Sequence, residues 1–227
     1  MRTTATPRVK VCCIASVEEA KIAIELGAAA VGLVSEMPSG PGVISEELIE
    51  QIAASIPPPV TSFLLTCRQD VGSIIDQQKR LRVNAIQLCD HLEGGSHRQL
   101  RDALPGISLV QVIHVNGPES IKEAVVIAPH VDAILLDSGN RTAAVKELGG
   151  TGRVHDWNLS KQIREAVHVP VFLAGGLNSD NVAAAINQVG PFAVDVCSGV
   201  RTEGRLDQNK LSRFFEAVHG VHREIEV

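Results

Sequence analysis

Short apolar runs alternate along the chain with longer segments in which apolar residues recur every three or four positions. Each run is four to seven residues long and is bounded by Gly, Pro, Asn, Asp or Ser. Continuous apolar runs of this length are typical of strands buried on both faces of a parallel sheet. Eight strands are predicted, at Val9–Ile14, Ala30–Val34, Val60–Thr66, Ala85–Cys89, Ser108–His114, Ala133–Asp137, Val171–Ala174 and Ala193–Cys197.

The segments between the predicted strands carry the signals of helix ends. Ser16 begins the first helix and forms a capping box with Glu19, and Gly27 follows the end of that helix. Three further residues suit the N-cap of the second, seventh and eighth helices, because a short polar side chain can accept a hydrogen bond from the first turn. They are Ser45, Asn178 and Asp207.

Strand and helix therefore alternate, and most strands begin about 20–30 residues after the previous one, which is the length of a βα unit. Eight such units predict a single α/β domain over residues 1–227, a (β/α)8 or TIM barrel, with a C-terminal tail from about residue 220. An open, doubly wound sheet is the alternative architecture. One connection, Ser138–Trp157, is long, and long connections in compact domains are usually functional.

Composition narrows the class of protein. The chain has 44% hydrophobic residues and a net charge of −5, with no basic run that could follow a nucleic-acid backbone. It has no apolar stretch of about 20 residues and no apolar signal core at its N-terminus, so we expect no membrane partner and a cytoplasmic location. The five cysteines are odd in number and irregularly spaced, which favours reduced thiols. A monomer or a homodimer fits this composition.

In a barrel of this kind, ligands bind at the C-terminal ends of the strands. Cys12 lies at the end of the first predicted strand and Asp137 at the end of the sixth, so a thiol and a carboxyl group would flank the mouth as a base and acid pair. Lys10 shares a strand face with Cys12, whereas Cys13 is expected to point to the opposite face. In the alternative interpretation, Cys12 is an inert small apolar residue and Asp137 caps a loop.

Three glycine-containing turns follow the last three strands: Gly149-Gly150-Thr151-Gly152, Gly175-Gly176 and Ser198-Gly199-Val200. Small residues allow backbone N–H groups to approach phosphate oxygens, and the loops after strands seven and eight commonly bind phosphate in this fold. Each turn alone could be only a tight turn. As a set they predict a phosphate site made of Gly150, Thr151, Gly152, Gly175, Gly176, Ser198 and Gly199.

These blocks, together with Leu135-Leu136-Asp137, Asp156-Trp157 and Leu173-Ala174-Gly175-Gly176-Leu177-Asn178, resemble the phosphoribosylanthranilate isomerase family from Val9 to about Phe215. The resemblance implies an Amadori rearrangement in tryptophan biosynthesis, acting on a phosphorylated small molecule without a cofactor or a metal. It also implies that Cys12 is the general base that takes the proton from C2 of the sugar. Asp137 would be the general acid that protonates the furanose ring oxygen.

The sequence departs from the family pattern at three places. Cys13 stands where the family has Gly, which would strain the backbone if that position needs a positive φ. Gly42 lies in a loop without a cation, where the family places an Arg on the anthranilate carboxylate. Cys89-Asp90 replaces His-Gly after the fourth strand.

Candidate substrate contacts follow from these departures. Arg68 or His114 could replace the missing cation, and Lys10 either supports the thiolate of Cys12 or forms an ion pair with Asp195. The predicted substrate-binding set is Lys10, Gln87, Cys89, Arg68, His114 and Asp195.

Three alternative functions remain open at this point. One is a diverged enzyme for another phosphorylated sugar or amine, and another is a non-catalytic phosphate-ligand binder. The last is a soft-metal site of Cys12, Cys67, Cys89 and Cys197 with His114, His91 or Asp137, although no metal is expected.

Overall fold

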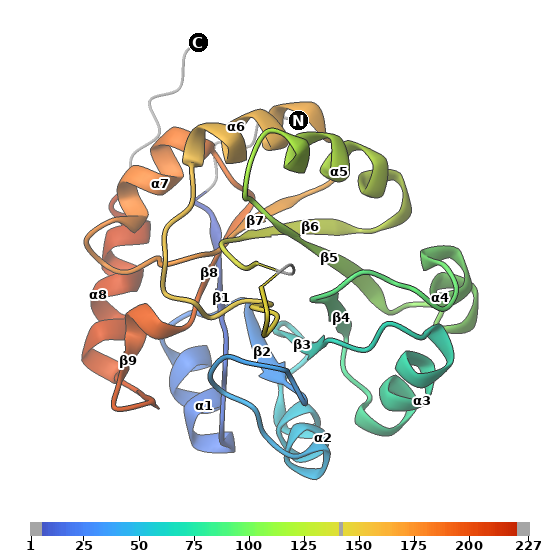
Figure 1. Cartoon of the computed structure of the whole chain (residues 1–227). Coiled ribbons are helices and arrows are strands. Elements are labelled where there is room, and N and C mark those ends of the chain that lie inside the picture. The colour runs from blue at the N-terminus through green and yellow to red at the C-terminus, as the bar shows by residue number, and fades with distance from the viewer. Residues whose placement is uncertain (1–5, 141–142, 222–227) are drawn as a thin grey trace.

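The computed structural model describes residues 6–140 and 143–221, and in it eight parallel strands close into a barrel. Each strand pairs with the next along the chain, and β8 pairs with β1, so the open-sheet alternative is excluded (Figure 1). The predicted single (β/α)8 barrel is confirmed. The strands are β1 (Arg8–Val11), β2 (Ala30–Val34), β3 (Thr61–Thr66), β4 (Ala85–Leu88), β5 (Ser108–His114), β6 (Ala133–Asp137), β7 (Val171–Leu173) and β8 (Ala193–Val196).

A helix follows each strand and covers the outside of the barrel (Figure 1). These helices are α1 (Val17–Glu25), α2 (Glu46–Ser55), α3 (Val71–Leu81), α4 (His97–Ala103), α5 (Glu119–Ile127), α6 (Trp157–Ala166), α7 (Val182–Val189) and α8 (Gln208–His219). Short elements that the sequence did not predict are the 3₁₀ turns η1 (Ala128–His130) and η2 (Ser198–Val200) and the hairpin of β9 (Arg201–Thr202) with β10 (Arg205–Leu206). No helix in the described part of the chain is long and apolar enough to cross a membrane.

The helix starts follow the predicted caps with one exception. The side chains of Ser16, Ser45 and Asp207 each accept a hydrogen bond from the first turn of their helix. Asn178 was predicted to cap α7, but that helix begins three residues later, at an N-cap residue Asn181. The Asn178 side chain instead accepts from the backbone N–H groups of Asp180 and Asn181, so it stabilises the turn before the helix.

The first strand is shorter than the predicted Val9–Ile14, since it ends at Val11. Cys13 has a φ of +62°, in the left-handed region that L residues avoid, and no strand can continue through that conformation. The predicted condition for strain at this position is therefore met. The tail predicted from about residue 220 falls mostly on residues 222–227, which lie outside the described residues.

A buried pair of opposite charges lies within the largely apolar interior of the barrel. Phe63, Phe172 and small residues such as Ala85 fill it. Among them the Lys10 Nζ atom donates a hydrogen bond to Asp195 Oδ1 at 2.9 Å, and the Lys10 side chain is fully buried. Because Lys10 belongs to β1 and Asp195 to β8, this ion pair joins the first and last strands where the barrel closes.

Lys10→Met is expected to destabilise the fold by about 3–5 kcal/mol, because it leaves a buried carboxylate without its cation. The double variant Lys10→Met/Asp195→Leu should recover much of that loss, since two apolar side chains then replace the pair. Urea unfolding of the two variants at neutral pH measures the difference. An equal loss of stability in both would show that the buried carboxylate is not the cause.

Candidate active site

A pocket of about 670 Å³, a volume that includes the space open to solvent, lies at the C-terminal ends of the strands. The long loop after β6, yellow in Figure 1, contributes part of its wall. Most of the residues predicted from the sequence line it: Cys12, Gln87, Cys89, Asp137, Gly150, Thr151, Gly152, Gly175, Gly176, Asp195 and Ser198. The loops after the strands thus bring together residues that are far apart in the chain.

Cys12 follows the last residue of β1, and its thiol is buried beside the ammonium group of Lys10. The two groups share space that Gly32 of β2 leaves open, because a Cβ at Gly32 would lie 2.9 Å from Cys12 Sγ and 3.1 Å from Lys10 Nζ. Burial alone would lower the pKa of Lys10, but the charges of Asp195 and Cys12 outweigh it and raise the pKa. Lys10 is therefore a permanent cation beneath the thiol, although it does not itself line the pocket.

Cys13 also lines the pocket, which corrects the expectation that it points away from Cys12. The cause is its left-handed backbone, since side chains alternate only along extended chain. Hydrogen bonds with the thiols of Cys12 and Cys197, together with burial, raise the pKa of Cys13 well above its usual value. Cys13 therefore stays protonated and can donate its S–H to either neighbour.

The side chain of Cys13 occupies the space in front of Gly42. A Cβ at Gly42 would lie 2.4 Å from Cys13 Cβ, and Gly42 itself has a φ of +81°. Any side chain at position 42 would therefore collide with Cys13 and strain the loop. Two of the departures from the family pattern, at positions 13 and 42, are thus in direct contact.

Asp137 is the last residue of β6, and its carboxyl group is buried between the glycine turns. A Cβ at Gly149 would lie 2.8 Å from its Oδ2 atom, and one at Gly175 would lie 3.3 Å from its Oδ1 atom. Burial raises the pKa of Asp137 to about 6, against the hydrogen bond that Oδ1 accepts from the Ser138 N–H at 2.7 Å. A carboxyl group with such a pKa can hold a proton near neutral pH and donate it.

The glycine turns pack directly against one another. Gly150, Gly152, Gly175 and Gly176 all have positive φ angles, and a Cβ at Gly176 would lie within 3 Å of the backbone of the loop after β6. Gly199 was also predicted to bind phosphate, but it is not among the lining residues. A Cβ there would lie 2.0 Å from the Leu177 carbonyl oxygen, so Gly199 allows η2 to pack on the loop after β7.

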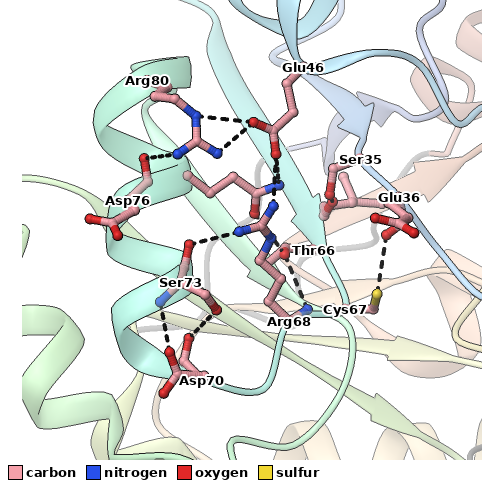
Figure 2. A network of polar contacts seen from close by, with 12 residues as sticks. Ser35, Glu36, Glu46, Thr66, Cys67, Arg68, Asp70, Ser73, Asp76 and Arg80 are labelled. Carbon is pink, nitrogen blue, oxygen red and sulfur yellow. Dashed lines mark hydrogen bonds and ion pairs between the residues drawn. The ribbon is translucent and has the colours of Figure 1, made fainter.

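The two residues predicted to replace the missing cation do not line the pocket. Figure 2 shows Arg68 between Glu46, whose Oε1 lies 3.1 Å from its Nη2, and the Ser73 carbonyl, to which Nη1 donates at 3.2 Å. His114 is buried at the end of β5, with its Nε2 atom 3.2 Å from the Cys89 carbonyl oxygen. Both side chains support the structure around the pocket rather than face it.

Several lining residues were missed from the sequence. The loop after β2 contributes Met37, Ser39, Gly40 and Pro41, and Leu148 and Cys197 come from the loops after β6 and β8. The Gly and Pro residues of the loop after β2 were the only sequence signal for these lining residues. Such residues indicate a turn, but they do not indicate which side chains of the turn face the pocket. Among the described lining residues the only charged side chains are those of Asp137 and Asp195. No group of three or more His, Cys, Asp or Glu among the described residues could hold a metal ion.

Known proteins resemble this chain over almost its whole length. The family model described as N-(5'-phosphoribosyl)anthranilate (PRA) isomerase matches residues 9–217. A protein of that name from Methanocella arvoryzae is 35% identical over 208 residues, which is 92% of this chain and 95% of the relative. The crystal structure of phosphoribosyl anthranilate isomerase from Thermotoga maritima is 32% identical, with a TM-score of 0.78 over 94% of this chain and 99% of that one.

A further solved structure of a similar protein contains a bound ligand. It is phosphoribosyl anthranilate isomerase in complex with reduced 1-(o-carboxyphenylamino)-1-deoxyribulose 5-phosphate. It is 30% identical to this chain, with a TM-score of 0.76, and the match covers 94% of this chain and 99% of that one.

The left-handed backbone at Cys13 predicts that Gly is more stable than Ala at this position, the reverse of the order expected at most buried positions. Cys13→Gly should be more stable than Cys13→Ala by about 1 kcal/mol, because both lose the thiol but only Ala keeps a Cβ at positive φ. Urea unfolding of both variants measures the difference. The matched control is buried Cys89, whose φ is not positive, where the Ala variant should be the more stable one. A Cys13→Ala variant at least as stable as Cys13→Gly would contradict the strain.

The raised pKa of Asp137 predicts a pH-dependent cost to stability. A carboxyl whose pKa is about 6 when folded and about 3.8 when unfolded loses stability as pH rises through that interval. Asp137→Asn should therefore be more stable than the parent at pH 8, by up to about 3 kcal/mol, with little difference at pH 4. Denaturant unfolding at both pH values tests this.

The control for Asp137→Asn is Asp207→Asn. The hydrogen bond from Thr202 and those of the helix cap lower the pKa of Asp207, so its removal should cost more stability at pH 8 than at low pH. A stability difference for Asp137→Asn that does not change between pH 4 and pH 8 would contradict the burial argument.

Proposed function

The chain belongs to the N-(5'-phosphoribosyl)anthranilate isomerase family, and from that premise we propose that Cys12 and Asp137 carry out the isomerisation in its pocket. The protein is an isomerase of tryptophan biosynthesis. The observation that carries the residue assignment is that a thiol after β1 and a protonatable carboxyl group at the end of β6 face one pocket together with the glycine turns.

The proposed reaction begins at the furanose ring. Asp137 donates its proton to the ring oxygen as the bond from that oxygen to C1 breaks, and the lone pair of the aryl nitrogen forms a C1=N double bond. The raised pKa of Asp137 supports this role, because a carboxyl group with a pKa of about 6 keeps a much larger protonated fraction near neutral pH than an ordinary aspartate does.

Cys12 acts in the second step. Its thiolate takes the proton from C2, and the electron pair of that C–H bond forms a C1=C2 double bond, which neutralises the nitrogen. Ketonisation of the resulting enol then yields 1-(o-carboxyphenylamino)-1-deoxyribulose 5-phosphate. The fixed charge of Lys10 lies beneath the sulfur of Cys12, and the S–H group of Cys13 lies beside it.

The substrate phosphate is assigned to the turns of Gly150–Gly152 and Gly175–Gly176 and to Ser198 at the start of η2. Four glycines of these turns have positive φ angles, which residues with a Cβ resist, and concavities built from such backbone suit anions. A negatively charged protein needs such local donors to hold a phosphate.

The proposal extends to the state of the protein in the cell. A cytoplasmic location fits the biosynthetic role of the relatives. A monomer and a homodimer both fit the family, since the enzyme from Thermotoga maritima is described as dimeric.

The catalytic assignment predicts that Cys12→Ala and Asp137→Asn each lower kcat by about 10²–10⁴-fold, the usual contribution of a positioned acid or base. The assay follows the loss of fluorescence when freshly made N-(5'-phosphoribosyl)anthranilate is added to purified protein. Asp102→Asn, which changes an exposed carboxyl group of α4 that does not line the pocket, is the matched control and should keep full activity.

Three outcomes separate the possible functions. A folded parent protein without turnover above background would reject the isomerase activity and favour another phosphorylated substrate. Turnover that survives in Cys12→Ala or Asp137→Asn would reject the residue assignment while the activity stands. Binding of phosphate ligands without turnover in the parent would favour a non-catalytic binder.

A further inference from the structure

The substrate of the proposed reaction carries a carboxylate on its aromatic ring, and the inference drawn here rests on that proposed function. The pocket has no described Lys or Arg among its lining residues, and its charged groups, Asp137 and Asp195, are acidic. An ionised carboxylate taken out of water without a hydrogen-bonded or charged partner is costly. A cation at the edge of the pocket would supply such a partner.

A second hollow of about 580 Å³ adjoins the pocket, and Met37 and Leu148 belong to the walls of both. These two side chains form an apolar bridge between the hollows, one from the loop after β2 and the other from the loop after β6. A flat aromatic ring that leaves the sugar end of the pocket on this side would lie against them. Its ortho substituent would then reach the second hollow.

Lys146 is the one cationic side chain among the described residues that line the second hollow. Its Nζ atom lies 2.6 Å from Oδ2 of Asp90, a carboxylate that is only 5% exposed, whereas the Lys146 side chain is 40% exposed. An ammonium group has three N–H donors, so its bond to Asp90 does not by itself prevent it from binding a ligand anion. The other charged residues that line the hollow, Glu36 and Asp90, are acidic and would repel an anion. Lys146 is therefore the lining side chain that would attract one.

The backbone of Lys146 is fixed to the opposite wall. Its carbonyl oxygen accepts a hydrogen bond of 2.7 Å from Ser39 Oγ, in the loop after β2 that also supplies Met37. Asp90 thus orients the charged end of the lysine, and Ser39 holds its backbone. The lysine is positioned from two sides, which lowers the entropy cost of using it in recognition.

We propose that Lys146, oriented by Asp90, binds the carboxylate of the substrate's aromatic ring and so determines specificity for the carboxylated aryl group. Asp90 acts here as a positioning residue. The loop after β6 then supplies both a wall of the sugar site and the cation of the aryl site.

The test compares two stable ligands by isothermal titration calorimetry: reduced 1-(o-carboxyphenylamino)-1-deoxyribulose 5-phosphate and the same compound without the carboxyl group. The parent protein should bind the carboxylated ligand about tenfold or more tightly than the other, because a hydrogen bond to a charged group is worth at least that factor. Lys146→Met should lose this preference through weaker binding of the carboxylated ligand alone. Lys146→Arg should keep part of it.

Two other cations from the same loop serve as controls. Arg153 pairs with Glu147 and lines neither hollow, so Arg153→Met should keep the full preference. Arg141 lies outside the described residues, and Arg141→Met is tested in the same way. A preference that survives in Lys146→Met, or that is lost in Arg141→Met or Arg153→Met instead, would overturn the inference.

A folding defect can be separated from a recognition defect. Lys146→Met removes the ion pair of a buried carboxylate, so the double variant Lys146→Met/Asp90→Asn, which removes both charges, is measured beside it. It should be folded by circular dichroism, bind the ligand without the carboxyl group like the parent, and show no preference. A double variant that keeps the preference would overturn the inference.

Failure of the inference differs from failure of the proposed function. A parent protein that turns over its substrate but shows no carboxylate preference would overturn the role of Lys146 and leave the isomerase assignment intact. A parent that binds neither ligand would reject the proposed function and the inference with it.

Discussion

The ion pair between Lys10 and Asp195 is the interaction on which the site depends most. It lies in the barrel interior, joins β1 to β8, and keeps a positive charge directly beneath the Cys12 thiol. Asp195 neutralises Lys10 well enough for the ammonium to be buried, yet the charge still acts on the sulfur. Gly32 completes the arrangement, because any side chain on that residue of β2 would occupy the space of both Cys12 and Lys10. The ion pair that joins the first and last strands of the barrel therefore also places a cation beside Cys12.

Other parts of the site lower the stability of the folded state. Asp137 is buried so completely that ionisation is opposed, and Cys13 holds a backbone conformation that suits glycine. Neither feature helps the barrel to fold, and both face the pocket. Buried ionisable groups and strained backbone conformations are common at functional sites, where a shifted pKa or a fixed side-chain direction serves the chemistry. The apolar strands and helices around the pocket supply the stability that permits them.

The barrel and much of its mouth could be predicted from the sequence because both follow from local pattern. Eight apolar runs gave the strands, and residues at strand ends such as Cys12, Asp137 and Gly176 had to meet at one end of a barrel. What could not be predicted depends on partners distant in sequence or on a single backbone angle. Arg68 is engaged by Glu46, 22 residues away, and Lys146 by Asp90, 56 residues away. The direction of Cys13 depends on one φ value that a period-two strand pattern does not reveal.

The contact between Cys13 and Gly42 also constrains how this sequence can change over time. Because the two residues share one volume, a side chain can be accommodated at position 42 only after the side chain at position 13 has been removed. The substitutions are therefore ordered: position 13 must become glycine before position 42 can acquire an arginine.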